Sequence, residues 1–193
     1  MKKLINYKDE DYLIELKSLL DSIDKDSLAN AILEIKKTFE KGSAIFTCGN
    51  GGSAMIASHY INDWVKSVNV YGGKKFKGFC LSDNTGLLTS YANDCSYEKI
   101  YSEVCKSYLS KEDLLIVVSG SGNSPNIINA INEAKTIGAK TLAILGYDGG
   151  QAIKIVDKSL HVPSFDMQIC EDFFMIFGHM VMKSLTNCKI VKS

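Results

Sequence analysis

The stretch LLIVVSGSGNSP, residues 114–125, decides the fold of this chain. It begins with a continuous apolar run from Leu114 to Val118, which is typical of a β-strand buried on both faces. The run ends in a loop of serines and glycines. Pro125 then suits the first turn of a helix, because its missing N–H is not needed there. Strand, polar loop and helix in this order predict a parallel sheet connected through helices.

The same order recurs on both sides of this stretch. Further strands are predicted at residues 44–48, 76–81, 141–145 and 160–163. Helices are predicted from the loop after the first strand to about 68, after 82–84, and over 97–109, 126–136 and about 168–185. We therefore expect an α/β fold of one domain, with residues 42–193 as the α/β core and a long C-terminal helix.

Two amphipathic helices are predicted within residues 1–41, ahead of the first strand. Between them, residues 24–27 are expected to form a turn that ends in an N-cap. The apolar stripes of these helices can pack on the domain itself or on a partner subunit. We favour the partner, because such helices offer a long apolar face, and we expect a homo-oligomer.

Charge and composition exclude several classes of protein. The chain carries 22 cationic and 22 acidic side chains, so no basic surface for nucleic acid or a membrane is expected. Every cationic residue is Lys, so phosphate recognition must rely on Lys, hydroxyl or backbone N–H groups. The six cysteines form no Cys-x-x-Cys pair, and no secretory or membrane-spanning apolar run is found. We expect a cytoplasmic protein.

Two of the strand–helix junctions have the composition of an anion-binding loop. The first loop reads GNGGS (49–53) and the second reads SGSGNS (119–124). Glycines let the backbone approach a ligand closely, and the free N–H groups of the next helix favour an anion. Either loop alone reads equally well as an ordinary turn. Neither fits a Walker or dinucleotide-binding pattern, so no nucleotide cofactor is expected.

The motifs, in their order and spacing, resemble the SIS (sugar isomerase) family. They are Gly49–Ala54 with His59, then Asn93-Asp94, then Ser119–Asn126, then Gly178-His179. Within that family the chain is similar to the phosphoheptose isomerases, which act on sedoheptulose 7-phosphate. The resemblance covers nearly the whole chain, including the two leading helices. It implies a five-stranded parallel sheet and a homotetramer whose active sites are lined by neighbouring subunits.

The resemblance also implies which residues bind a sugar phosphate. Ser53, Ser119, Ser121 and Ser124 would bind the phosphate. Asn50, Gly51, Gly52, Asn93 and Asp94 would make further substrate contacts. Gly120 stands where the family usually has Thr, so only its backbone N–H is left as a donor there.

Isomerisation of an aldose and a ketose through an enediol needs a base and an acid–base group at oxygen, often with a Lewis acid. His59 and Asp63 share one face of the helix after the first loop, and Glu171 lies eight residues before His179. The resemblance implies that His59, Asp63, Glu171 and His179 form a zinc site that overlaps the catalytic groups. The expected base is Asp63 or Glu171, and the expected partner at oxygen is His179.

The expected function is the conversion of sedoheptulose 7-phosphate to glycero-manno-heptose 7-phosphate. The family usually has Glu in the place of Asp63 and Gln in the place of Glu171, which leaves the base and the sugar open. One alternative is an isomerase of another sugar phosphate. The other is a non-catalytic protein that binds a phosphosugar or acts as a scaffold.

Overall fold

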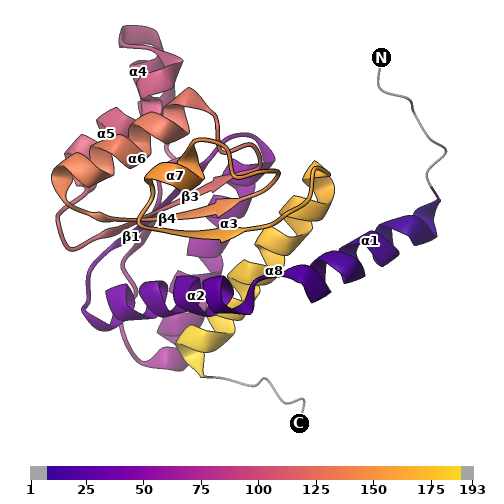
Figure 1. Cartoon of the computed structure of the whole chain (residues 1–193). Coiled ribbons are helices and arrows are strands. Elements are labelled where there is room, and N and C mark those ends of the chain that lie inside the picture. The colour runs from indigo at the N-terminus through magenta and orange to yellow at the C-terminus, as the bar shows by residue number, and fades with distance from the viewer. Residues whose placement is uncertain (1–7, 188–193) are drawn as a thin grey trace.

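A computed structural model describes residues 8–187 of the chain, apart from the side chain of Asp9 (Figure 1). The strands are β1 (Ile45–Gly49), β2 (Gly78–Cys80), β3 (Leu114–Ser119), β4 (Lys140–Leu145) and β5 (Lys158–His161). The α-helices are α1 (Asp9–Ser22), α2 (Lys25–Glu40), α3 (Gly52–Ser67), α4 (Thr85–Asp94), α5 (Ile100–Tyr108), α6 (Pro125–Ile137), α7 (Ala152–Ile155) and α8 (Met167–Thr186). A π-helix, η1 (Val68–Gly72), and a 3-10 helix, η2 (Tyr97–Lys99), complete the described elements.

The strands pair in parallel throughout, in the order β2-β1-β3-β4-β5. The expected α/β class and five-stranded parallel sheet are thereby confirmed. The helices that follow the neighbouring strands β1 and β3 lie on opposite faces of the sheet. Helix α3 follows β1 and packs in the core of one face, and α6 follows β3 and packs in the core of the other. In open parallel sheets, ligands bind in the crevice beyond such a pair of strands. This topological switch point lies where the first and second loops begin.

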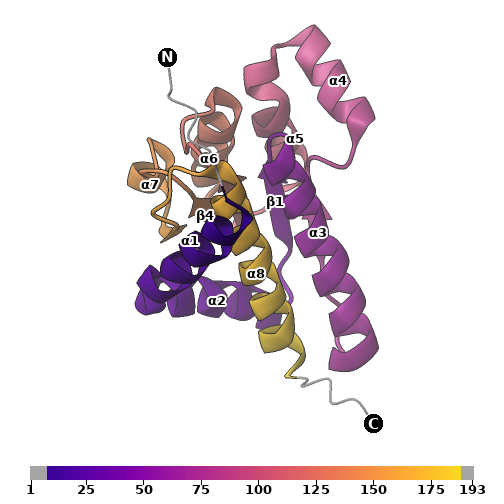
Figure 2. The same cartoon turned by 90° about the vertical axis from the view of Figure 1, so that its right-hand side faces the viewer.

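Two apolar cores cover the two faces of the sheet, with α5, α6 and α7 on one face and α2, α3 and α8 on the other (Figures 1 and 2). Alternate residues of β3 supply them: Ile116 and Val118 enter the core beside α3 and α8, while Leu115 and Val117 enter the other. This two-residue alternation explains why the run from 114 to 118 is apolar without interruption.

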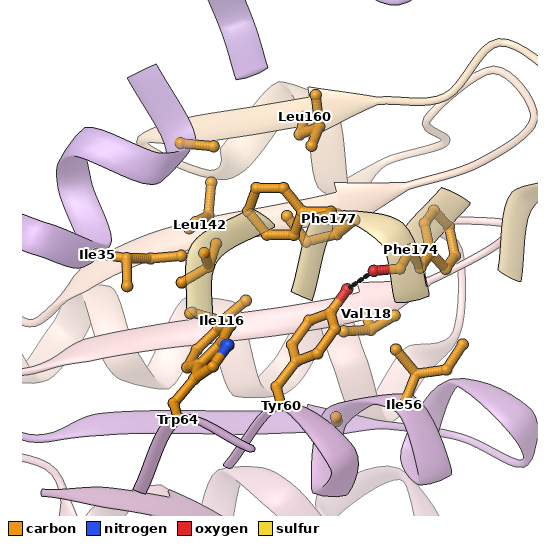
Figure 3. Packing of buried hydrophobic residues seen from close by; sticks show 14 of the residues in the cluster. Ile35, Ile56, Tyr60, Trp64, Ile116, Val118, Leu142, Leu160, Phe174 and Phe177 are labelled. Atoms are coloured by element: carbon orange, nitrogen blue, oxygen red, sulfur yellow. Dashed lines mark hydrogen bonds between the residues drawn. The ribbon is translucent and has the colours of Figure 1, made fainter. Parts of the chain in front are cut away.

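The helices α3 and α8 pack closely through aromatic side chains and one glycine (Figure 3). Tyr60 stacks on Trp64 and donates its hydroxyl to the carbonyl of Phe174. Trp64 Nε1 donates to the carbonyl of Gly178 at 2.9 Å. A Cβ at position 178 would lie 2.4 Å from two ring atoms of Tyr60, so glycine is needed for this approach. The close approach places the next residue of α8, His179, against α3.

Several described boundaries differ from the predicted ones. The strand predicted at 76–81 covers only Gly78–Cys80, and the helix predicted at 97–109 is divided into η2 and α5. Asp24, at the beginning of the predicted turn, is the N-cap of α2 and accepts bonds from the N–H groups of Asp26 and Ser27. The strand predicted at 160–163 covers Lys158–His161, because backbone pairing with β4 includes polar residues and a proline at 163 has no N–H to donate. The short elements α7 and η1 were not predicted, since four or five residues make only about one turn and show no repeating apolar pattern.

Two helices project from the body of the protein, α1 and α4 (Figures 1 and 2). Helix α4 has no buried residue. Helix α1 exposes about two thirds of Leu13 and Ile14 (68% and 66%). Its Tyr12 hydroxyl donates to the Asp172 carboxylate of α8 at 2.7 Å. Helix α1 therefore presents apolar side chains to solvent, whereas Leu87, Leu88, Tyr91 and Ala92 of α4 are partly buried against the core beside α5 and α6.

Within the described residues, no helix is both long enough and apolar enough to cross a membrane. The described cysteines, residues 48, 80, 95, 105 and 170, are free thiols. The sixth, Cys188, lies outside the described residues. Burial raises the pKa of the Cys48 and Cys105 thiols, which keeps these two in the protonated form.

Candidate active site at the switch point of the sheet

The first loop turns sharply from β1 into α3. Gly51 is the N-cap of α3 with a φ of 55° and a ψ of −125°, a conformation that glycine adopts readily. Because Gly51 has no side chain, it leaves the N–H groups of the first turn of α3 uncapped. The hydroxyls of Ser82 and Tyr101 both donate to the carbonyl of Gly49 and so fix the base of the loop. Burial raises the pKa of Tyr101, which keeps this donor protonated.

The second loop is held by bonds between its own serines and backbone. Ser119 Oγ accepts from the N–H of Gly122 at 3.1 Å, and Ser121 Oγ accepts from the N–H of Asn123 at 3.2 Å. These bonds leave the hydroxyl hydrogen of each serine able to donate to a ligand. Ser124 is the N-cap of α6, and its hydroxyl makes no capping bond. The loop therefore offers three serine hydroxyls beside the start of α6, where Pro125 has no N–H and Asn126 Oδ1 accepts from the N–H of Ile127 at 3.0 Å.

A pair of asparagines joins the two loops. Asn50 Nδ2 donates to Asn126 Oδ1, and Asn126 Nδ2 donates to Asn50 Oδ1, each at 2.9 Å. Asn126 is 1% exposed, and the Tyr97 hydroxyl also donates to Asn50 Oδ1 at 3.2 Å. The side chain of Asn50, predicted to contact the substrate, is thus largely engaged in holding the loops together. Sequence reasoning missed this role of Asn126, although a polar residue at a buried helix position is a usable signal.

Glu171 reaches the first loop from α8. A Cβ at position 52 would lie 2.3 Å from Glu171 Oε1, so the carboxylate rests on the Cα of Gly52, the first residue of α3. The start of a helix carries partial positive charge, which favours a carboxylate there. Glu171 therefore borders the region in which the first loop would meet a ligand.

The two histidines predicted as a pair come together between α3 and α8. His59 Nε2 lies 3.3 Å from His179 Nε2 and 3.2 Å from Asp63 Oδ2. His179 Nε2 lies 3.7 Å from the same carboxylate oxygen. The side chains of His59, Asp63 and His179 are 38%, 23% and 48% exposed, so the cluster is open to solvent. The site thus combines a carboxylate with two imidazoles that a ligand can reach.

Three of the four predicted metal ligands can hold one ion. One ligand atom from each of His59, Asp63 and His179 lies within 4.8 Å of the others. Glu171 is not part of this group, so its place in the expected set of four stays a prediction. It precedes His179 by eight residues, about 12 Å along the helix axis, and its carboxylate points to Gly52 instead.

Asn93 and Asp94 are less directly connected to the loops. They end the projecting helix α4, are exposed, and bond to each other, Asn93 Nδ2 to Asp94 Oδ1 at 2.8 Å. Three residues further on, Tyr97 donates to Asn50 of the first loop. Tyr97, which follows these two residues, therefore reaches the site. The contact of Asn93 and Asp94 with a substrate stays a prediction.

The fold and the site together define a doubly wound α/β domain in which two polar loops lie at the switch point of the sheet and a His–Asp cluster lies between α3 and α8. Residues 11–146 match the SIS domain family. The chain is 34% identical to a phosphoheptose isomerase from Aliarcobacter butzleri over 151 residues, 78% of this chain and 79% of that protein. It is also 34% identical to one from Helicobacter pylori over 166 residues, 86% of this chain and 85% of that protein. The chain belongs to the SIS domain family.

Solved structures support the fold. A phosphoheptose isomerase from Neisseria gonorrhoeae aligns with a TM-score of 0.83 at 24% identity, covering 91% of this chain and 93% of that one. One from Francisella tularensis aligns with a TM-score of 0.84 at 22% identity and the same coverage. The family match contains both loops, His59 and Asp63, whereas α8 with Glu171 and His179 lies beyond it.

Proposed function

We propose that this protein is an aldose–ketose isomerase that converts sedoheptulose 7-phosphate to glycero-manno-heptose 7-phosphate through an enediol. Its relatives of 34% identity are phosphoheptose isomerases. The observation that carries the proposal is the arrangement at the switch point. There the Asn50–Asn126 pair joins the two loops, Glu171 of α8 reaches the first loop, and a His–Asp cluster lies between α3 and α8.

The phosphate would bind at the two loops. Ser119, Ser121 and Ser124 supply hydroxyls, and the first turn of α3 with Ser53 supplies N–H groups and a positive helix end. This set compensates for the absence of Arg, because backbone and hydroxyl donors bind phosphate without a guanidinium. The ester end of the sugar is therefore fixed at the edge of the sheet.

The carbons that react would lie at the His–Asp cluster. His59 follows Gly52 by seven residues, which is about 10 Å along α3. A sugar chain held by its phosphate at the loops and extended along α3 and α8 would bring its carbonyl end toward this cluster. A reaction at C1 and C2 of a sugar whose phosphate lies at the other end of the chain requires such positioning.

We assign the base to Asp63 rather than to Glu171. The Asp63 carboxylate lies within 3.7 Å of both imidazole Nε2 atoms, so a proton that it takes from carbon has acid–base partners beside it. Glu171 lies at the first loop, beside the first turn of α3. There its oxygens can accept hydrogen bonds from sugar hydroxyls. His179 then transfers the proton between the two substrate oxygens.

The donor set of the cluster suits zinc. Two imidazole nitrogens and one carboxylate oxygen within 4.8 Å of one another match a catalytic zinc site with three protein ligands. When bound, zinc would polarise the carbonyl of the sugar.

We expect about one zinc per chain in metal analysis of the protein. His59→Ala should abolish this binding while leaving the melting temperature of the metal-free protein unchanged. Unchanged zinc content in that variant would contradict the assignment.

We further propose a homotetramer in the cytoplasm, with residues 1–41 at the subunit contact and residues 42–193 as the catalytic core. The exposed Leu13 and Ile14 of α1 support a partner subunit on that helix. The free thiols of the described cysteines suit a reducing compartment. Light scattering of the purified protein tests the assembly.

The direct test is to incubate the protein with sedoheptulose 7-phosphate, with added zinc and with a chelator, and to look for an aldose product. Ketose phosphates of five and six carbons form the comparison panel. Faster turnover of one of these shorter ketose phosphates would mean that it, and not sedoheptulose 7-phosphate, is the substrate. Binding without turnover of any member would favour a non-catalytic phosphosugar-binding protein.

Ser121→Ala should mainly raise KM. The change removes one donor to a charged group, which costs about 1–2 kcal/mol or about 5- to 30-fold. Because the lost contact would be made equally in the ground state and the transition state, kcat should stay close to its original value. Steady-state kinetics measure both constants, and an unchanged KM would mean that the second loop is not the phosphate site.

A further inference from the structure

The side-chain amides of Asn50 and Asn126 have a defined orientation. Asn126 Oδ1 accepts from the backbone N–H of Ile127 at 3.0 Å, so exchanging the oxygen and nitrogen of this amide would set two donors against each other. Asn126 Nδ2 therefore faces Asn50 Oδ1, and Asn50 Nδ2 faces Asn126 Oδ1, each at 2.9 Å. A backbone N–H of α6 thus fixes which atoms of an amide on the first loop are already bonded.

Tyr97 completes the bonds of Asn50 Oδ1. Its hydroxyl donates to this oxygen at 3.2 Å, so the oxygen has two donors, one for each lone pair. One hydrogen of Asn50 Nδ2 goes to Asn126, and the other meets no acceptor within residues 8–187. Because Asn50 is only half-buried, this hydrogen is what its side chain has left to offer a ligand. Asn50 is therefore a donor and not an acceptor.

The segment that carries Tyr97 is itself fixed to the first loop. Tyr97 and Tyr101, four residues apart, send their hydroxyls to the consecutive loop residues 50 and 49. Asn129 Nδ2 of α6 donates to the carbonyl of Glu98 at 2.9 Å, which ties η2 to α6. The hydroxyl of Tyr97 is thus held at the loop although the residue is 59% exposed.

We propose that Asn126 and Tyr97 are positioning residues that hold the Asn50 amide as a hydrogen-bond donor to a phosphate oxygen. This inference rests on the proposed phosphate site. A sugar hydroxyl can both donate and accept, whereas the oxygens of a phosphate dianion only accept, so a donor-only group suits the phosphate. Without its two partners, the amide can rotate and turn its own oxygen toward the anion.

The test is the affinity of the full chain for inorganic phosphate, measured by calorimetry. Asn50→Ala removes a donor to a charged group and should weaken binding about tenfold. Asn126→Ala frees the amide and should weaken it by nearly as much, while Tyr97→Phe, which loses only the hydroxyl, should cost about threefold. Asn132→Ala, at an exposed asparagine of α6, and Tyr108→Phe, at an exposed tyrosine of α5, are the controls and should keep the original affinity.

A double variant separates positioning from a merely structural role. Asn126→Ala added to Asn50→Ala should cause no further loss, because Asn126 acts through Asn50. Additive losses, or an unchanged affinity in both Asn126→Ala and Tyr97→Phe, would overturn the inference. Melting temperatures check the fold, and the exposed Tyr97 keeps the test decisive if Asn126→Ala does not fold.

The proposed function fails in a different way. Phosphate binding with these effects, but no turnover of sedoheptulose 7-phosphate, would contradict the isomerase and leave the roles of Asn126 and Tyr97 in place. Failure of the unchanged protein to bind phosphate would contradict the phosphate site, and this inference with it.

Discussion

Replacing His179 by alanine should abolish isomerisation and leave the protein folded. The imidazole of His179 is 48% exposed and contacts His59 and Asp63 across the gap between α3 and α8. Its removal leaves the Gly178 contact with Tyr60 and Trp64 in place, so the helices stay packed. Loss of a general acid–base group lowers kcat by about a hundredfold to ten-thousandfold.

The experiment measures turnover of sedoheptulose 7-phosphate, with circular dichroism and the melting temperature as checks on the fold. Assays with and without added zinc separate a lost proton carrier from a lost metal ligand. His161→Ala is the control for removing a histidine, because His161 lies in β5 and bonds the carbonyl of Tyr147. Near-normal turnover by the His179 variant would remove the mechanism.

The second large effect is expected at Asp63. Asp63→Asn keeps the shape of the side chain but removes the base that lies beside both histidines, so kcat should fall about a hundredfold to ten-thousandfold. Glu171→Gln makes the same chemical change at the first loop. Because an amide oxygen can still accept hydrogen bonds from sugar hydroxyls there, this variant should keep kcat within about tenfold and change KM instead.

The pair of variants distinguishes the two carboxylates that the sequence leaves open. Both are carboxylate-to-amide changes on half-buried side chains, so their effects are directly comparable. The opposite result would assign the role of base to Glu171. In that case Glu171→Gln would bind the substrate as the unchanged protein does but lose kcat, while Asp63→Asn would retain kcat.

Much of the fold follows from local sequence signals. The uninterrupted apolar run at 114–118 predicts a strand buried on both faces, and the serine–glycine loop with Pro125 predicts the helix start at α6. These signals are strong because backbone periodicity and turn chemistry act over a few residues. The meeting of His59 and Asp63 follows in the same way from a spacing of four on one helix.

Contacts between segments distant in the sequence could not be predicted in this way. The spacing of eight residues on α8 places Glu171 near the face of His179. Its carboxylate nevertheless lies at the first loop, because it is about two turns away from His179 and Gly52 has no side chain to exclude it. The Asn50–Asn126 pair and the contact of Met167 with Gly120 depend on how close α8 and the loops pack. Glycines in a sequence indicate such approaches without naming the partner.

The central claim is that the two loops bind the phosphate and that the His–Asp cluster moves a proton at the far end of the sugar. Proton NMR of sedoheptulose 7-phosphate incubated with the protein in D₂O tests it directly. We expect an aldose 7-phosphate carrying deuterium at C2, and no reaction of unphosphorylated sedoheptulose. Recovery of the ketose without deuterium, or equal turnover of the unphosphorylated sugar, would contradict the claim.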